Sequence, residues 1–348
     1  MHASTTLAPD IRFALSRDIE AEIPGLHAVN EACRRAAGEL DRGTLQGFGA
    51  FFRHLENCDP ATDLLIAWDD AAIVGYARVW WSDTNEDERW YETRGYVHPD
   101  HRRRGIGGRL LAWTEARRLE LVAADERDGL AEGRPLWFTG FNYDGDIGGD
   151  VLLGGAGYEP FRQFFSMRRP DLSGIHDQPL PAGLELRPIP HEPAAIRAVI
   201  AADTEAFRDH FGSIDDDEVV VAQILDDPDT DTSLWLVAYD GDEIAGAILN
   251  GVRPGHDGRT VGWLDSVFTR RRWRKRGLAR ALIARSLELL RERGADSAAL
   301  GVDTENPNQA LGLYESAGFR RASSTTSYRK PVPGTPAPPR STLEEATP

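Results

Sequence analysis

The sequence has little cysteine and no long apolar run. Only Cys33 and Cys58 occur among its 348 residues, which excludes a disulfide framework, and no cysteine or histidine pair has the spacing of metal ligands. The first residues lack the apolar core of a secretory leader, and no stretch approaches the roughly 20 apolar residues that cross a membrane. We therefore expect a cytoplasmic protein that binds neither a metal ion nor a membrane.

Positive charge is scarce as well. The chain carries 40 Lys and Arg residues against 56 Asp and Glu residues, which gives a formal net charge of −16, and only Lys275 and Lys330 are lysines. An acidic protein repels polyanions, which argues against a nucleic-acid partner. With 41% hydrophobic residues, the chain can instead bury sizeable cores, and its length suits two domains.

What the sequence does contain is an internal repeat. Residues 97–120 and 267–294 each combine a short strand pattern, an arginine-rich turn and an amphipathic helix. In the second helix the apolar stripe comprises Leu278, Leu282, Ile283, Leu287 and Leu290. The similarity extends to 135–144 with 297–306, to 152–169 with 313–330, and to two hairpin patterns at 63–81 and 233–250. The chain is therefore predicted to hold two copies of one α/β unit.

The boundaries of the two units follow from composition. We predict an N-terminal domain at 1–170 and a C-terminal domain at 184–330, joined by a linker at 171–183 that is rich in proline and glycine. Residues 331–348 contain few apolar side chains, so a disordered tail is expected there. Because a tandem repeat can imitate a dimer within one chain, both a monomer and a homodimer stay open.

Both copies begin the amphipathic helix with the pattern Arg-x-x-Gly-x-Gly/Ala. Its residues are Arg102, Gly105 and Gly107 in the first copy and Arg274, Gly277 and Ala279 in the second. A helix N-terminus has unpaired amides and partial positive charge, and small residues there let a pyrophosphate come close. The pattern lacks the third glycine of a dinucleotide-binding motif and the lysine of a Walker loop. We therefore predict a phosphate site of another kind.

The two copies resemble the GNAT superfamily of N-acetyltransferases. Its signature is a strand, then Arg/Gln-x-x-Gly-x-Gly/Ala at the start of a helix, a further strand, and an Asn-containing loop before a helix with a tyrosine. Residues 263–287 and 298–319 match it almost completely, and 10–170 match it weakly outside the turn. The resemblance implies two tandem α/β domains, each with a mixed, mostly antiparallel central sheet flanked by helices. It also implies acetyl-CoA or another short acyl-CoA as co-substrate.

The resemblance assigns cofactor contacts to the second domain. The turn and the helix start would hold the pyrophosphate through Arg274, Lys275, Arg276, Gly277, Leu278, Ala279 and Arg280. The strand Val267, Phe268 and Thr269 would pair with the pantetheine arm, and one of its amides would polarise the thioester carbonyl. Asn306 or Asn308 would donate a hydrogen bond to the pantetheine or line its channel.

The resemblance also assigns the chemistry. Tyr314 would protonate the departing CoA thiolate, in keeping with a thiol pKa of ~8.5 and a phenol pKa of ~10. Asp265 could accept the proton of the amine, directly or through water, or could only pair with an arginine. The other candidates for this base are Asp303, Glu305, Glu205, Asp209 and His210, and solvent could also take the proton.

The first domain keeps the turn but not the acid. If 317–319 is aligned with 156–158, Leu153 replaces Tyr314, and Gly145 and Ile147 replace Asn306 and Asn308. An acyl-CoA could still bind at Val97, Arg102, Arg103, Arg104, Gly105, Ile106, Gly107 and Gly108. We expect a catalytically silent domain that binds acyl-CoA. A pure scaffold is the alternative, and Tyr143 or Tyr158 could replace the acid.

The acceptor stays open in the sequence. Small amines, aminoglycosides, a mycothiol precursor, amino acids and protein N-termini are all compatible with a family whose acceptor loops share no motif. The acidic segments 215–218 and 226–231 could attract a cationic amine or form a solvated loop, and they lack the spacing of a calcium site. We expect an N-acetyltransferase acting on a small-molecule amine. A non-catalytic acyl-CoA-binding protein is the alternative.

Overall fold

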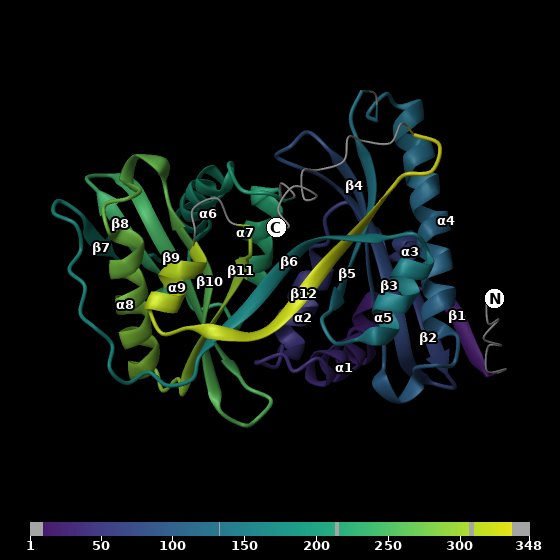
Figure 1. Cartoon of the computed structure of the whole chain (residues 1–348), viewed down its shortest axis with the longest axis horizontal. Helices are drawn as coiled ribbons and strands as arrows, with labels where there is room; N and C mark the ends of the chain where they lie inside the picture. The colour runs from purple at the N-terminus through teal and green to yellow at the C-terminus, as the bar shows by residue number, and fades with distance from the viewer. Residues whose placement is uncertain (1–9, 132, 213–215, 306–309, 336–348) are drawn as a thin grey trace, which may run out of the picture.

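The computed structural model describes residues 10–131, 133–212, 216–305 and 310–335. One sheet of twelve strands runs through this part of the chain, with helices packed against it (Figure 1). Its strand order is β1-β2-β3-β4-β5-β12-β6-β11-β10-β9-β8-β7. The paired strands are antiparallel except for β4 with β5 and β10 with β11, which confirms the predicted mixed, mostly antiparallel sheet.

Each half of the chain contributes the same succession of elements. The first half comprises β1 (Ile11–Leu15), α1 (Ile19–Ala36), α2 (Leu45–Arg53), α3 (Pro60–Asp63), β2 (Leu64–Asp69), β3 (Ala72–Asp83), β4 (Arg89–Val97), η1 (Pro99–His101), α4 (Ile106–Arg127), β5 (Leu136–Tyr143), α5 (Ile147–Gly155) and β6 (Glu159–Arg169). The second half comprises β7 (Glu185–Arg187), α6 (Pro193–Phe207), α7 (Asp217–Asp226), η2 (Thr232–Leu234), β8 (Leu236–Asp240), β9 (Glu243–Pro254), β10 (Thr260–Thr269), η3 (Arg271–Trp273), α8 (Leu278–Glu292), β11 (Ser297–Asp303), α9 (Ala310–Ser316) and β12 (Arg320–Pro331). The predicted hairpins are β2–β3 and β8–β9, so the repeat in the sequence is also a repeat in the structure.

The two halves exchange their last strands. β6 ends the first half but pairs with β11 of the second half. β12 ends the second half and pairs with β5 of the first half, and the two exchanged strands also pair with each other. In Figure 1, β12 crosses from one lobe to the other beside β6. Each half therefore completes its sheet with a strand from the other half.

The ordered structure extends past the boundaries that composition suggests. Pro331 ends β12, and Val332 is 1% exposed in a core with Leu136 and Tyr158, although a disordered tail is expected from residue 331. Leu172, in the expected linker, is buried in the core of the second half. Composition misses both residues because a single apolar side chain can be buried by neighbours that are distant in the sequence.

Helices cover both faces of the sheet in each half. α8 covers one face of the second half through Leu278, Leu282, Ile283, Leu287 and Leu290, each at most 1% exposed, which confirms the predicted stripe. α6 covers the opposite face with Ile196, Val199 and Ile200. α4 and α1 do the same in the first half. The burial of these apolar stripes holds the helices against the sheet.

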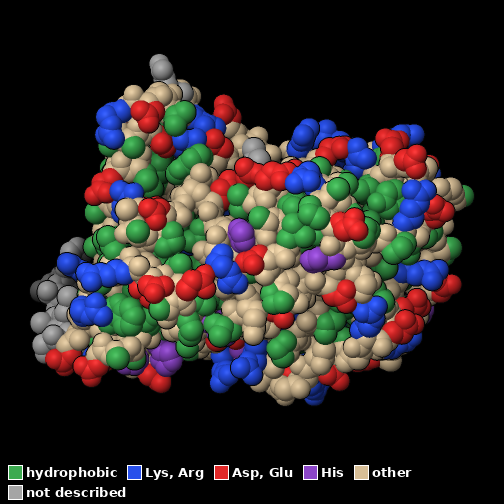
Figure 2. All heavy atoms as spheres, turned by 180° about the vertical axis from the view of Figure 1, so that it is seen from behind, with side chains coloured by type: hydrophobic (Ala, Val, Ile, Leu, Met, Phe, Trp, Pro, Cys, Tyr) green, Lys and Arg blue, Asp and Glu red, His purple; other side chains and the backbone are tan. Residues whose placement is uncertain are grey.

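Ion pairs and aromatic contacts join the two halves. Arg53 on α2 pairs with Asp226 on α7 at 2.9 Å, and Arg162 on β6 pairs with Asp303 on β11 at 2.6 Å. Phe211 of the second half contacts two rings of the first half, Trp90 and Phe161. On the face shown in Figure 2, acidic and basic side chains are interspersed.

Candidate active site

Two parallel strands separate in each half and leave a fork in the sheet. β10 and β11 pair from Val261 to Leu264 on the β10 side, and from Asp265 onward β10 pairs with β9 alone within the described chain. β4 and β5 likewise pair only from Arg89 to Glu92 on the β4 side. Backbone groups along an open strand edge can pair with an extended ligand, so each fork offers a place for a pantetheine-like arm.

The start of a helix follows each fork. Gly277 (φ +89°) precedes α8 and Gly105 (φ +82°) precedes α4, and neither helix start has a side-chain cap. Both glycines adopt the left-handed conformation that a Cβ disfavours. Uncapped amides at a helix N-terminus are donors for an anion. The geometry of both turns therefore fits the predicted phosphate cradle.

The first arginine of each motif ties the turn to the protein. Arg274 donates to the carbonyl oxygens of Thr269 at 3.0 Å and Ala206 at 2.7 Å, and to the Asp209 carboxylate at 2.6 Å. Arg102 donates to the carbonyl of Val97 and pairs with Asp146 at 3.2 Å. Both guanidinium groups thus hold the turn in place. The motif had predicted that these two arginines bind phosphate. The exposed cations at the second helix start are Lys275, Arg276 and Arg280.

Gly246, which lies outside the predicted motif, lets the strand β9 approach both β10 and the start of α8 closely. A Cβ on Gly246 of β9 would lie 2.6 Å from the carbonyl oxygen of Phe268 and 3.2 Å from Leu278 Cδ2. Gly75 occupies the matching place in the first half, where a Cβ would lie 3.0 Å from the carbonyl of Tyr96. The signal available in the sequence is a glycine at the same position of both predicted hairpins.

A β-bulge distinguishes the second fork. The register between β9 and β10 shifts between Leu264 and Ser266, so Asp265 is the extra residue, whereas β3 and β4 pair without a shift. Leu264 belongs to the core beneath α8, and Ser266 donates to Asp203 of α6 at 2.5 Å on the other face. A bulge bends its strand and redirects a side chain. It therefore places a carboxylate and a rearranged backbone at the mouth of the fork.

Asp265 lies between solvent and the protein interior. Its side chain is 37% exposed and its Oδ1 accepts from Arg253 Nη2 at 2.7 Å. Burial raises the pKa of Asp265, and the charge of Arg253 opposes that shift. Burial also raises the pKa of the neighbouring Asp203 to about 6, against the hydrogen bond from Ser266. Two carboxyl groups with raised pKa values therefore lie on the α6 face beside the fork, and one of them reaches solvent.

Tyr314 lies on the opposite side of the strand. It projects from α9 into the core beneath α8, where it is 6% exposed and contacts Phe319 with ring centroids 6.2 Å apart. Val267 packs against the same core. Burial raises the pKa of Tyr314 to about 12, so the phenol keeps its proton at neutral pH. Asn306 and Asn308 lie outside the described residues.

Comparisons with known proteins agree with this geometry. Residues 196–319 match the Acetyltransferase (GNAT) family, and residues 60–134 match an Acetyltransferase (GNAT) domain. The mycothiol acetyltransferase of Kineococcus radiotolerans is 31% identical over 315 residues, which are 88% of this chain and 94% of the relative. That of Thermobispora bispora is 31% identical, over 76% of this chain and 83% of the relative. The chain belongs to the GNAT family. It is an N-acetyltransferase with two GNAT domains in tandem.

Solved structures share the tandem GNAT fold. A GCN5-related N-acetyltransferase from Sphaerobacter thermophilus aligns with a TM-score of 0.65 at 24% identity, over 94% of this chain and 97% of that chain. A tandem GNAT protein from the clavulanic acid biosynthesis pathway aligns with a TM-score of 0.66 at 15% identity, over 94% and 100%. At these identities the likeness shows the fold alone.

The four other acidic candidates for the base of the second GNAT domain are each paired with an arginine. Asp209 accepts from Arg274, which lowers the pKa of that carboxyl to about 2. Glu205 pairs with Arg270 at 2.6 Å. The remaining two acids, Asp303 and Glu305, both pair with Arg162, and burial lowers the pKa of His210. Among these groups Asp265 is the acid that a bulge places beside the fork.

A buried arginine bridges the two strands at the fork of the first GNAT domain. Arg118 on α4 is fully buried and donates from one nitrogen, Nη1, to the carbonyl oxygens of Tyr91 on β4 at 3.1 Å and Thr139 on β5 at 3.0 Å. Its Nη2 donates to the Tyr158 hydroxyl at 2.5 Å. In the second domain Leu290 occupies the matching sequence position, the same number of residues after the helix-start glycine. The guanidinium therefore occupies the point at which the two strands separate, and it holds Tyr158 in a structural contact.

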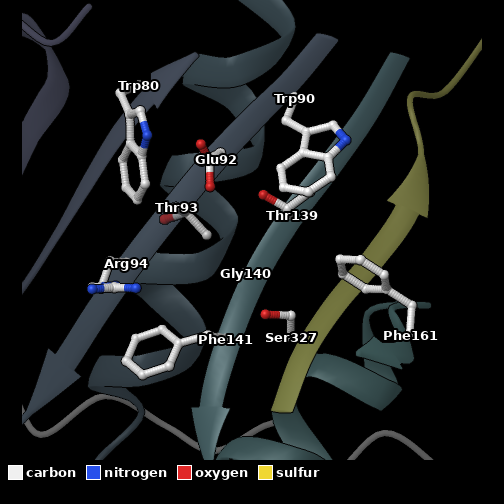
Figure 3. A pocket seen from close by; sticks show the side chains of 10 residues that line it. All are labelled: Trp80, Trp90, Glu92, Thr93, Arg94, Thr139, Gly140, Phe141, Phe161 and Ser327. Atoms are coloured by element: carbon white, nitrogen blue, oxygen red, sulfur yellow. The ribbon is translucent and has the colours of Figure 1, made fainter. Parts of the chain in front are cut away.

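Figure 3 shows what remains open at the first fork. The pocket has a volume of about 60 Å³, enough for a few water molecules. Its lining residues come from β3, β4, β5, β6 and β12 and are Trp80, Trp90, Glu92, Thr93, Arg94, Thr139, Gly140, Phe141, Phe161 and Ser327. Burial raises the pKa of Glu92, whose carboxylate accepts from Ser82 at 2.6 Å.

Two further properties concern the described residues only. None of their helices is long and apolar enough to span a bilayer. Within the same residues, the structure brings together no group of three or more His, Cys, Asp and Glu side chains that could hold a metal ion.

Proposed function

We propose that the protein transfers an acetyl group from acetyl-CoA to the primary amine of a small molecule, by direct transfer in a ternary complex within the C-terminal GNAT domain. The observation that carries this proposal is the bulge at Asp265, which lies beside an open fork and an uncapped helix start. The first domain has the helix start but pairs β3 with β4 without a bulge and has Arg118 at its fork. The chemistry is therefore assigned to one domain.

The residues of the second domain fit acetyl-CoA as co-substrate. The amides at the start of α8 would bind the pyrophosphate, with Lys275, Arg276 and Arg280 adding positive charge from exposed positions. The open edge of Val267–Thr269 would pair with the pantetheine amides. Gly246 keeps the strand close to the helix start, so that both contacts are made by one continuous surface.

The transfer needs a proton acceptor, an oxyanion donor and a proton donor. The amine nitrogen would attack the thioester carbonyl from the α6 face, its proton passing to Asp265 as the C–N bond forms. A backbone amide at the bulge would stabilise the charge on the carbonyl oxygen. Tyr314, on the α8 face, would give its proton to the sulfur as the C–S bond breaks. The fork thus separates the acid from the base.

The relatives suggest the first acceptor to test. They are named mycothiol acetyltransferases, and a mycothiol precursor with a primary amine is the acceptor that we propose. The first domain is proposed to be catalytically silent, because Leu153 replaces the acid and Arg118 ties Tyr158. The alternative function is acyl-CoA binding without transfer. The observation that favours it is the uncapped start of α4, which the first domain retains.

The Tyr314→Phe variant tests the assignment. We expect turnover to fall about 10²-fold or more, the usual contribution of a positioned proton donor, with unchanged acetyl-CoA affinity by calorimetric titration. Tyr239→Phe removes a hydroxyl from β8 in the same domain and should leave turnover unchanged. Unchanged turnover in Tyr314→Phe would refute the role of the phenol. A wild-type protein that binds acetyl-CoA but releases no thiol with a panel of amines would support the binding-only alternative.

A further inference from the structure

A loop of the first domain reaches the proposed site of the second. The segment after α1 forms a bridge between Asp41 and Gly255 of the β9–β10 hairpin, and the amide of Arg42 donates to the carbonyl of Pro254 at 2.7 Å. Asp41 is only 4% exposed. A buried carboxylate needs partners that compensate its charge, and these partners connect it to Asp265.

Four side chains of alternating charge run from α1 to the bulge. Arg34 Nη2 donates to Asp41 Oδ1 at 2.7 Å. The other oxygen, Asp41 Oδ2, lies 3.9 Å from Arg253 Nε, and Arg253 Nη2 contacts Asp265 Oδ1 at 2.7 Å. Arg253 therefore lies between a carboxylate of the first domain and the proposed base of the second.

The geometry of Arg253 limits its hold on Asp265. A guanidinium binds a carboxylate most tightly through two parallel N–H donors. Here Nε faces Asp41 and Nη2 faces Asp265, so the two acids share one edge of the guanidinium. Asp265 Oδ2 lies instead beside Gly251, where a Cβ would come within 2.8 Å of it. One oxygen of Asp265 is thus held and the other is left for a substrate.

We propose that Asp41 is a positioning residue for the acetyl-transfer site of the second domain, because it keeps Arg253 from binding Asp265 through Nε and Nη2 together. The inference rests on the proposed function, in which Asp265 accepts the amine proton. It gives the first domain a role in the reaction, since that domain supplies the side chain that controls how Arg253 contacts Asp265.

Other charged groups also face this cluster. Asp227, after α7, acts on Asp265 from the same face, and Asp203 of α6 holds the adjacent Ser266. Glu31 pairs with Arg34 at 3.5 Å, and His256 lies in the field of Glu31, Arg34 and Asp41. Among the ion pairs of the described residues, the one that Arg253 makes through Nε is with Asp41, so removal of the Asp41 charge should change the contact of Arg253 with Asp265.

The Asp41→Asn variant tests the role. It keeps the size of the side chain and the backbone bridge but removes the charge. Arg253 should then bind Asp265 through two nitrogens, which lowers the pKa of Asp265. We expect the acidic limb of the kcat/KM profile to move down by about one pH unit and kcat to fall about tenfold, with the KM for acetyl-CoA unchanged. Carbon-13 NMR titration of Asp265 should show the same downward shift without any substrate.

Glu39→Gln is the matched control. Glu39 belongs to the same loop and accepts from Ser323 of β12 at 2.9 Å, so this variant also removes one negative charge from the contact between the halves. It should keep the wild-type acidic limb. If Asp41→Asn does not fold, Asp41→Ser is measured in its place.

The outcomes separate the two proposals. An unchanged Asp265 titration in the Asp41 variant would overturn the positioning role, whatever the activity. A shifted Asp265 titration in Asp41→Asn, together with a wild-type protein that acetylates no amine, would leave the electrostatic contact intact and overturn the proposed function instead.

Discussion

The two helix-start glycines allow one substitution to be compared at matched positions. Gly277 and Gly105 have φ values of +89° and +82°, so a Cβ costs about 1–2 kcal/mol at either position. The backbone can relieve this strain by leaving the left-handed region, which turns the first amides of the helix. Losing one charge-assisted hydrogen bond costs about 1.5–3 kcal/mol, or roughly 10- to 150-fold in affinity. We therefore expect Gly277→Ala to raise the KM for acetyl-CoA by that factor.

Gly105→Ala provides the control for this prediction. It should lower the free energy of unfolding by a similar 1–2 kcal/mol while leaving the KM for acetyl-CoA and kcat at their wild-type values. Steady-state kinetics with thiol detection and denaturant titration measure both effects. If Gly105→Ala raises the KM as much as Gly277→Ala does, the assignment of catalysis to the second cradle is wrong. If neither variant changes the KM, the helix starts do not hold the pyrophosphate.

Two further predictions concern stability. Gly246→Ala should lower the free energy of unfolding by about 1–3 kcal/mol because its Cβ would meet the Phe268 carbonyl at 2.6 Å. Gly312→Ala, in α9 with no described residue within 4 Å of the new Cβ, should raise it by about 0.5–1 kcal/mol. Equal effects in denaturant titrations would contradict the close approach. Burial raises the pKa of Asp203 to about 6, so the folded state holds this proton more tightly, and the resulting stability is full below a pH of about 4 and is lost as the pH rises through about 6. Asp203→Asn should remove this loss, and its advantage over the wild type should grow between pH 4 and 7; an advantage that does not vary with pH would refute the shifted titration.

Local patterns predict the elements of this fold well. The stripe from Leu278 to Leu290 repeats at helical spacing and becomes the buried face of α8, because a helix on a sheet must bury one side. The glycines of the two turns are predictable too, since few other residues accept a left-handed conformation. The identity of the family follows from the same local signals, which recur twice in the chain.

The role of individual side chains is less predictable. Arg274 looks like a phosphate ligand in the sequence, yet three acceptors of the protein hold it. Val332 lies at the start of a segment rich in proline and glycine but is buried by residues almost two hundred positions earlier. In both cases the partners are distant in the sequence, so spacing and composition contain no information about them.

The sequence by itself therefore determined the two GNAT units, their helix starts and the leucine, Leu153, that stands where the second copy has Tyr314, because each of these depends on neighbours within a few residues. Only the tertiary structure decided the exchange of β6 and β12, the insertion of Arg118 into the first fork and the bulge that exposes Asp265. It alone also brought Asp41 of one domain to Arg253 of the other. These features arise from contacts between segments that are distant in the sequence. Their free energy of strand pairing and burial therefore depends on the complete fold and not on local sequence.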